Sequence, residues 1–181
     1  MSRPAVFAGT RPLAVRVRVA TVADLPAVNS IVERAVMTWK LPERVKRLGL
    51  PSYRYHAHDF VHMHLAVAED AHGTVLGVAA WDTPDPRDMP AGRRGLLLHG
   101  LYVDPQRQHA GIGSLLLDAA AAAARAGDCD GVLVKAQADA TGFFAARGMR
   151  LQPVEDPARD YPHRYWLATT TPAIEGINRM L

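Results

Sequence analysis

The chain has little cysteine and no long apolar segment. Cys129 is the single cysteine among 181 residues, which excludes an internal disulfide framework and a cysteine-rich zinc site. No apolar run approaches the ~20 residues that a membrane-spanning helix needs. The short apolar patch around Phe7 is too small for the core of a signal peptide. These absences favour a soluble, cytoplasmic enzyme or binding protein with no membrane partner.

An excess of charge of one sign is also lacking. The 21 Lys and Arg residues exceed the 18 Asp and Glu residues by 3, although the isoelectric point is about 9.3. No block of five like charges occurs, whereas nucleic-acid-binding proteins usually concentrate their basic residues. The sequence therefore predicts no nucleic-acid partner, and a small anionic ligand is compatible with its charge.

The composition is that of one globular domain. Hydrophobic residues make up 49% of the 19.7 kDa chain. A chain of this size can bury roughly 70% of the surface that it exposes when unfolded. Residues 1–13 contain Pro4, Gly9 and Pro12 and show no periodicity, so we expect a loose leader there. The single domain is expected to span residues 14–181.

Hydrophobic periodicity predicts a mixed α/β fold. Alternating or short apolar runs predict strands at 15–19, 63–69, 74–81, 96–103, 132–136, 149–154 and 164–168. Apolar residues at helical spacing predict four helices. The first starts at 21–24 and runs to Val36, the second lies between Pro42 and Pro51, and the other two span 111–126 and 138–147. The strand at 96–103 is apolar almost throughout, so we expect it in the centre of the sheet, covered on both faces.

The segment between this strand and the helix at 111–126 has the features of a phosphate site. Gly111 and Gly113 lack a Cβ, so a phosphate can approach the backbone. The first N–H groups of the helix have no internal partner and lie at the positive end of its dipole. Arg107 and His109 add positive potential. The spacing fits neither a P-loop nor a Rossmann G-x-G-x-x-G loop.

Two motifs carry a resemblance to a known family. Gln108-x-x-Gly111-x-Gly113 resembles the Q/R-x-x-G-x-G/A signature of the GCN5-related N-acetyltransferases, the GNAT superfamily. The segment from Gln137 to Met149 is similar to the family's next motif, typically N-x-x-A-x-x-F-Y-E-K-x-G-F. The resemblance implies a mixed, mostly antiparallel central sheet that is splayed at the cofactor site and flanked by helices.

The resemblance also implies acetyl-CoA as co-substrate, without a metal, and assigns residues to it. The backbone of Leu101, Tyr102 and Val103 would pair with the pantetheine arm, and one N–H there would polarise the thioester carbonyl. The second motif would contribute Gln137, Ala140 and Phe144. The pyrophosphate would bind the loop of Gln108, His109, Ala110, Gly111, Ile112, Gly113 and Ser114.

Two residues depart from the family's pattern. Gln137 stands where an Asn usually meets the pantetheine arm, and it keeps the amide but adds a methylene. Phe144 stands where a Tyr often protonates the departing thiolate, which Phe cannot do. The leaving thiol has a pKa near 8.5, so it can depart as a thiolate. Water, Tyr102 or a Tyr from the 161–165 loop would then supply the proton.

His99 is the candidate catalytic base, because an acceptor ammonium must lose a proton before it attacks. It precedes Leu101 by two residues, so both side chains are expected on one face of the strand. The alternative is a buried His that hydrogen-bonds within the sheet. Trp39, Trp81 and Tyr161 are candidate walls of the acceptor site, with core packing as the alternative.

A metal site is not expected. The histidines of one short stretch cross from a helix into a strand, which scatters their rings. They are His56, His58, His62 and His64.

These features predict an enzyme that moves an acetyl group from acetyl-CoA to a primary amine of a small molecule by direct transfer. Two alternatives stay open: an N-acetyltransferase of proteins or peptides, and an acyl-CoA-binding sensor or regulatory module whose catalysis has decayed. Phe144 motivates the second. The sequence is compatible with a homodimer and does not fix the oligomeric state.

Overall fold

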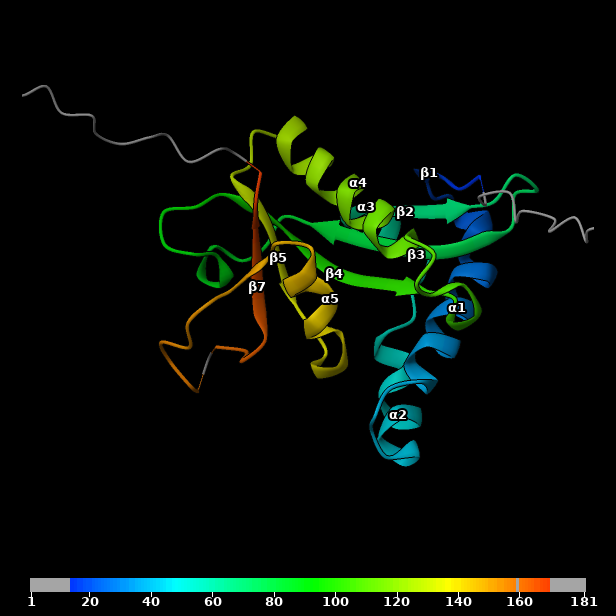
Figure 1. Cartoon of the computed structure of the whole chain (residues 1–181), viewed down its shortest axis with the longest axis horizontal. Helices are drawn as coiled ribbons and strands as arrows, with labels where there is room; N and C mark the ends of the chain where they lie inside the picture. Colours follow the sequence, from blue (N-terminus) through cyan, green and yellow to red (C-terminus); the bar gives the residue numbers. More distant parts are fainter. Residues whose placement is uncertain (1–13, 159, 170–181) are drawn as a thin grey trace, which may run out of the picture.

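The computed structural model describes residues 14–158 and 160–169, which form a sheet with helices on both faces (Figure 1). The strands lie in the order β1-β2-β3-β4-β5-β7-β6 across the sheet. Their bounds are Arg16–Val19 (β1), His64–Glu69 (β2), Val75–Asp82 (β3), Gly95–Val103 (β4), Gly131–Lys135 (β5), Arg150–Leu151 (β6) and Arg164–Ala168 (β7). The predicted leader at 1–13 and the predicted domain end at 170–181 lie outside the described residues.

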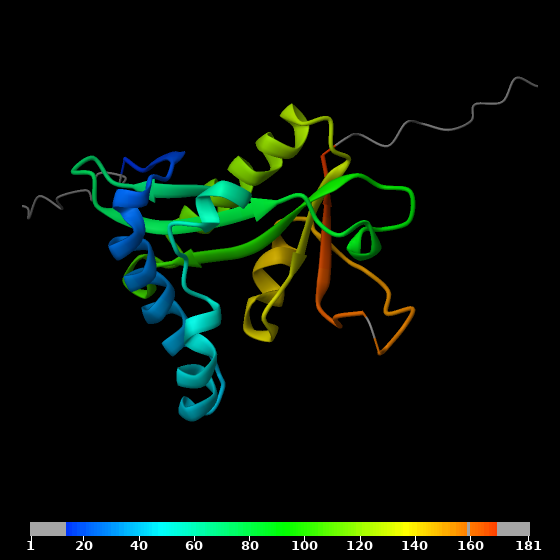
Figure 2. The same cartoon turned by 180° about the vertical axis from the view of Figure 1, so that it is seen from behind.

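The helices lie in two layers. They span Leu25–Met37 (α1), Glu43–Gly49 (α2), Asp59–His62 (α3), Ile112–Ala126 (α4) and Thr141–Ala146 (α5). α1 covers one face of the sheet and α4 the other, as Figures 1 and 2 show from opposite sides. Among the described residues, no helix is long and apolar enough to cross a membrane.

The predicted fold class is confirmed: the sheet is mixed and mostly antiparallel. β4 and β5 are the parallel pair among the described strands, and every other neighbouring pair is antiparallel. The predicted strand at 149–154 is shorter, because β6 pairs with β7 only at Arg150–Leu151. α3 is the helix expected among the histidines before β2, for which no bounds were predicted, since four residues are too few to show a helical period.

Each face of the sheet has its own apolar core. Under α4, fully buried Ile112, Leu116 and Leu117 pack on the sheet, and alanines of the same helix let it approach closely. Under α1, fully buried Val28 and Val32 pack on other side chains of the sheet. The sheet is thus covered on both faces in its centre, as its apolar strands require.

One extra residue in β4 breaks the alternation of its side chains. Leu98 and Gly100 face consecutive residues of β3, so His99 is left over as a β-bulge. Leu98 and Leu101 consequently both pack on the α4 side, although they are three positions apart in the sequence. The bulge therefore changes which side chains of β4 reach each face.

β4 and β5 part halfway along their length. Their pairing ends at Leu98 and Val134. β5 goes on to pair with β7, whereas β4 continues to Val103 along β3. The second half of β4 thus has no partner strand on its β5 side among the described residues, which is the splayed sheet that the family resemblance implies.

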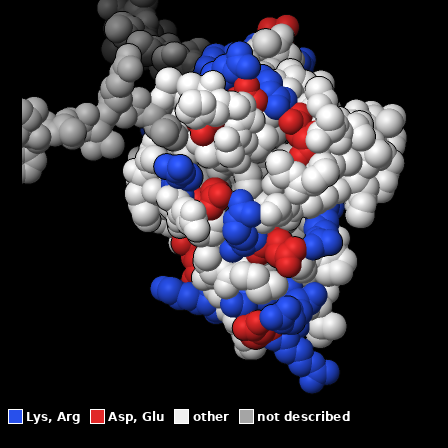
Figure 3. Space-filling view, turned by 90° about the vertical axis from the view of Figure 1, so that its right-hand side faces the viewer, with Lys and Arg blue, Asp and Glu red and all other residues white. Residues whose placement is uncertain are grey.

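Charged side chains of both signs are mixed on the face shown in Figure 3. Basic side chains, with acidic ones among them, gather toward its lower tip, where α2 lies. Acidic side chains lie among the basic ones over the rest of this face.

Candidate functional site

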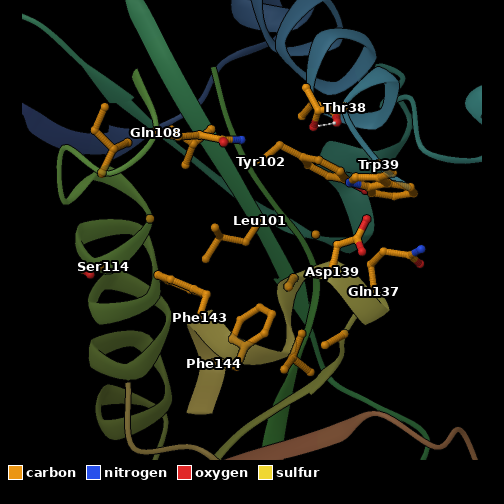
Figure 4. A pocket seen from close by; sticks show the side chains of 18 of the residues that line it. Thr38, Trp39, Leu101, Tyr102, Gln108, Ser114, Gln137, Asp139, Phe143 and Phe144 are labelled. Atoms are coloured by element: carbon orange, nitrogen blue, oxygen red, sulfur yellow. Dashed lines mark hydrogen bonds between the residues drawn. The ribbon is translucent and has the colours of Figure 1, made fainter. Parts of the chain in front are cut away.

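A cavity of about 780 Å³ lies where β4 and β5 part (Figure 4). Its walls come from the end of α1, the second half of β4, the loop and first turn of α4, the end of β5, and α5. The predicted site residues that line it are Trp39, His99, Leu101, Tyr102, Val103, Gln108, His109, Gly111, Ile112, Gly113, Ser114, Gln137, Ala140, Phe144 and Tyr161.

Two predicted residues are not among those that line the cavity. Trp81 is 7% exposed and packs in the core under α4, because residues of β3 alternate and its side chain points to that face. Ala110 is exposed and lies between two residues that do line the cavity. No group of three potential metal ligands is found among residues 14–158 and 160–169, the histidines at 56–64 included.

The loop before α4 is tied to the sheet and to α1. The Asp104 carboxylate accepts a hydrogen bond from the backbone N–H of Gln106 at 3.0 Å. It also pairs with the Arg34 guanidinium of α1 at 2.8 Å. The backbone N–H of Asp104 donates to the carbonyl of Leu76 at 2.9 Å. These bonds hold the start of the loop in place.

The backbone of this loop alternates in handedness. His109 and Gly111 have φ angles of 62° and 83°, with Ala110 between them. Alternation of this kind turns successive N–H groups toward one point and forms an anion-binding nest. A left-handed φ at a non-glycine residue such as His109 costs of order 1–3 kcal/mol and is frequent at ligand sites.

The first turn of α4 presents bare backbone to the cavity. Gly111 is the N-cap, and no side chain caps the helix. A Cβ at Gly113 would lie 3.2 Å from the Phe143 ring and 3.6 Å from Leu101. Glycine therefore permits this close packing without displacing the Phe143 ring, and the free N–H groups remain available to an anion. Arg107 and His109 line the same end of the cavity and add positive charge or hydrogen-bond donors.

The opposite end of the cavity is built from side chains. Trp39 and Tyr53 meet edge to face, with ring centroids 5.1 Å apart. The Asp139 carboxylate accepts a hydrogen bond from the backbone N–H of Lys40 at 2.7 Å. In Figure 4, Asp139 lies beside Trp39 and Gln137, across the cavity from Gln108. Asp139 was not predicted as a site residue, although it is the first carboxylate after a buried strand.

His99 lies in the β4 bulge and bonds to a residue of β3. Its Nε2 is 2.7 Å from Oδ1 of Asp82, and the two side chains are 34% and 24% exposed. The prediction that His99 and Leu101 share a face of the strand is wrong. The bulge between them puts Leu101 under α4. Trp81 of β3 also points to the α4 side. The next residue, Asp82, and the His99 side chain that bonds to it therefore lie on the opposite face.

Comparison with known proteins identifies the family. Residues 33–149 match the family model described as Acetyltransferase (GNAT) family. The chain belongs to the GNAT family of acetyltransferases. A comparison with curated proteins finds no significant match.

Solved structures of GNAT proteins share the fold of this chain. A GCN5-related N-acetyltransferase from Rhodopseudomonas palustris is 17% identical with a TM-score of 0.67, over 88% of this chain and 99% of that one. The PaiA N-acetyltransferase from Thermoplasma acidophilum, in complex with coenzyme A, is 13% identical with a TM-score of 0.65, over 85% and 97%. A GNAT acetyltransferase from Brucella melitensis, in complex with acetyl-CoA, is 18% identical with a TM-score of 0.59, over 87% and 89%.

Phe144, which the resemblance matches to a Tyr that is frequent in the family, has no hydroxyl. Phe144 is 4% exposed and meets Phe143 edge to face at 5.1 Å. Tyr165 lies behind it, 6.4 Å away between ring centroids, and is not among the cavity-lining residues. Burial, with a smaller contribution from Tyr53, raises the pKa of Tyr102 well above its usual value. Tyr102 therefore holds its proton tightly and is a poor acid.

Proposed function

We propose that this GNAT protein transfers an acetyl group from acetyl-CoA to the primary amine of a small molecule. The observation that carries the proposal is one continuous cavity with two unlike ends. One end is the backbone nest and helix start at 109–114, and the other is lined by His99, Trp39 and Asp139. A pyrophosphate fits the first end, and an amine with its base fits the second.

The residues present fit acetyl-CoA. The amides of Ile112, Gly113 and Ser114 would hold the pyrophosphate, and the free edge of β4 after Leu98 would pair with the pantetheine arm. Gln137, Ala140 and Phe144 would form the other side of that channel. An N–H of the free β4 edge would stabilise charge that develops on the thioester oxygen.

Direct transfer needs no covalent enzyme intermediate. The acceptor ammonium loses one proton to His99, and the neutral nitrogen then bonds to the thioester carbon. The C–S bond breaks, the nitrogen loses its second proton as the amide forms, and the thiolate takes one proton from water or from Tyr161. One proton is released to solvent overall. A thiol pKa near 8.5 makes the missing acid at Phe144 a modest loss.

The dimensions favour a small acceptor. The cavity of about 780 Å³ has to contain the pyrophosphate end and the pantetheine arm of acetyl-CoA as well as the acceptor, and volumes of about 300–1,000 Å³ are typical of small-molecule sites. The hydrogen bond from Lys40 to Asp139 also joins two walls at the acceptor end. A protein or peptide N-terminus is the less favoured acceptor.

The rival function is an acyl-CoA-binding sensor without catalysis, which Phe144 favours. Two measurements separate it from the enzyme: thermal unfolding with acetyl-CoA, and release of free thiol across a panel of amines. At about 100 times Kd, acetyl-CoA should add ~2.7 kcal/mol, which raises the Tm of a chain of this size by roughly 5–10 °C.

The outcomes distinguish the hypotheses. A rise in Tm with thiol release supports the acetyltransferase. A rise in Tm without release on any amine supports the sensor. No rise in Tm contradicts the assignment of residues 108–114 to the pyrophosphate.

A further inference from the structure

The hydrogen bond between His99 and Asp82 fixes the chemistry of the imidazole. An ionised carboxylate has no hydrogen to donate, so Oδ1 of Asp82 accepts and Nε2 of His99 donates. A neutral imidazole carries one N–H, so Nδ1 then holds the lone pair. Nδ1 has no hydrogen-bond partner among the described residues. The bond therefore leaves a basic nitrogen available to another molecule.

The β-bulge brings His99 and Asp82 together, because the two residues would not lie opposite each other if β3 and β4 paired in regular register. Asp82 of β3 lies opposite Leu97, and Trp81 lies opposite Leu98. His99 reaches Asp82 because it is the extra residue of the bulge. β-bulges commonly re-aim a side chain beside an active site.

The backbone next to the bulge is closely packed. A Cβ at Gly100 would come within 2.5 Å of both the Tyr102 ring and the Tyr55 hydroxyl. Tyr55 is 7% exposed in the core under α1. The backbone at Gly100, the residue after His99, therefore lies directly against two aromatic side chains.

His99 lines the cavity, whereas Asp82 is not among the lining residues. The carboxylate thus lies behind the imidazole as seen from the acceptor. Lys135 also lines the cavity, and its ammonium is paired with Asp88 at 2.9 Å. Lys135 thus pairs with Asp88, and the Asp82 carboxylate pairs with His99.

We propose that Asp82 is a positioning residue that holds His99 in the tautomer with hydrogen on Nε2 and presents Nδ1 to the acceptor amine. The proposal rests on the proposed function, because it assumes that His99 is the base. Nδ1 takes a proton from the ammonium, and the resulting imidazolium keeps its hydrogen bond to the carboxylate. Asp82 touches no substrate and acts through His99.

The test is Asp82→Asn, which keeps the size of the side chain. Asn can offer His99 either its carbonyl oxygen or its amide N–H, so both tautomers become populated. Nitrogen-15 NMR of the imidazole, at a pH where histidines are neutral, reports the tautomer directly. The variant His99→Gln assigns the signal. We expect a single tautomer with hydrogen on Nε2 in the natural chain and a mixture in Asp82→Asn.

Kinetics provide the second readout. Loss of a fixed tautomer should lower kcat tenfold or more, since general base catalysis contributes about 10²–10⁴-fold, while KM for acetyl-CoA stays unchanged. Asp85→Asn is the matched control. Asp85 is a nearby carboxylate that pairs with Arg87 and is not among the cavity-lining residues, so kcat and the His99 signal should not change.

Two results would overturn the proposal: hydrogen on Nδ1 of His99 in the natural chain, or a kcat of Asp82→Asn within twofold of the natural value. A failure of the proposed function looks different. In that case no amine is acetylated by the natural chain, and the NMR measurement still decides whether Asp82 fixes the tautomer.

Discussion

The two ends of the cavity are built by different means. The end at 108–114 uses backbone, with N–H groups exposed by glycine and by left-handed φ angles within seven consecutive residues. The acceptor end uses side chains that come from α1, β4 and the turn after β5. A backbone site depends on local sequence, whereas a side-chain site depends on how distant elements pack. Substitutions should therefore have different effects at the two ends.

The largest effect is expected at the backbone end. Gly111→Asp should weaken acetyl-CoA binding by 100-fold or more, because a carboxylate would face the pyrophosphate at a helix start that favours anions. Isothermal titration calorimetry measures the Kd. Gly73→Asp is the matched control, since Gly73 has a φ of 81° in the β2–β3 turn and, like Gly111, no atom near its missing Cβ. Undiminished affinity in Gly111→Asp would contradict the site, and equal losses in both variants would indicate general destabilisation.

The next effect should separate catalysis from binding. His99→Ala should lower kcat by about 100-fold and flatten the rise of the rate with pH, because the acceptor loses its base. Steady-state kinetics over a pH series measure both. An unchanged pH profile in His99→Ala would mean that another group is the base.

His109→Asn tests the other end of the cavity. Asn tolerates the positive φ at that position, and the variant should raise KM for acetyl-CoA while kcat stays the same.

The same contrast explains how much the sequence could predict. The glycine loop was found because Gln108, Gly111 and Gly113 are close in sequence and follow an apolar strand. Every strand of the sheet was also located, since each is marked by its own apolar pattern. The β4 bulge was missed because the run at 96–103 is apolar on both sides of His99, so one extra residue leaves no break in the pattern.

The acceptor end could be predicted only in part. Asp82, Asp85 and Asp88 look alike in sequence, and only the register between β3 and β4 shows which of them meets His99. Trp39 and Trp81 are similarly indistinguishable by residue type. Trp39 follows a helix end beside the cavity, whereas Trp81 lies inside a strand on the face under α4. Long-range packing decides both cases.

The two tryptophans sharpen the comparison further. Trp39→Ala should raise KM for the acceptor roughly tenfold, since an aromatic contact contributes about 0.5–1.5 kcal/mol beyond burial, and should leave the Kd for acetyl-CoA unchanged. Trp81→Ala should instead lower the free energy of unfolding by about 3–5 kcal/mol, as is usual for buried aromatic residues. Kinetics and denaturant unfolding measure the two effects. A stability loss in Trp39→Ala as large as that of Trp81→Ala would place Trp39 in the core.

The smallest effect concerns how the acceptor end is held together. Asp139→Ala removes the acceptor of the Lys40 N–H, and the segment that carries Trp39 loses one hydrogen bond, worth about 1 kcal/mol. KM for the acceptor should therefore rise roughly fivefold, with kcat and acetyl-CoA binding unchanged. Asp139→Asn keeps a hydrogen-bond acceptor but removes the charge, so it should behave like the natural chain if the bond alone matters. An equal rise in KM for both variants would instead show that the carboxylate attracts a positively charged acceptor, and amines with a second positive charge should then lose most.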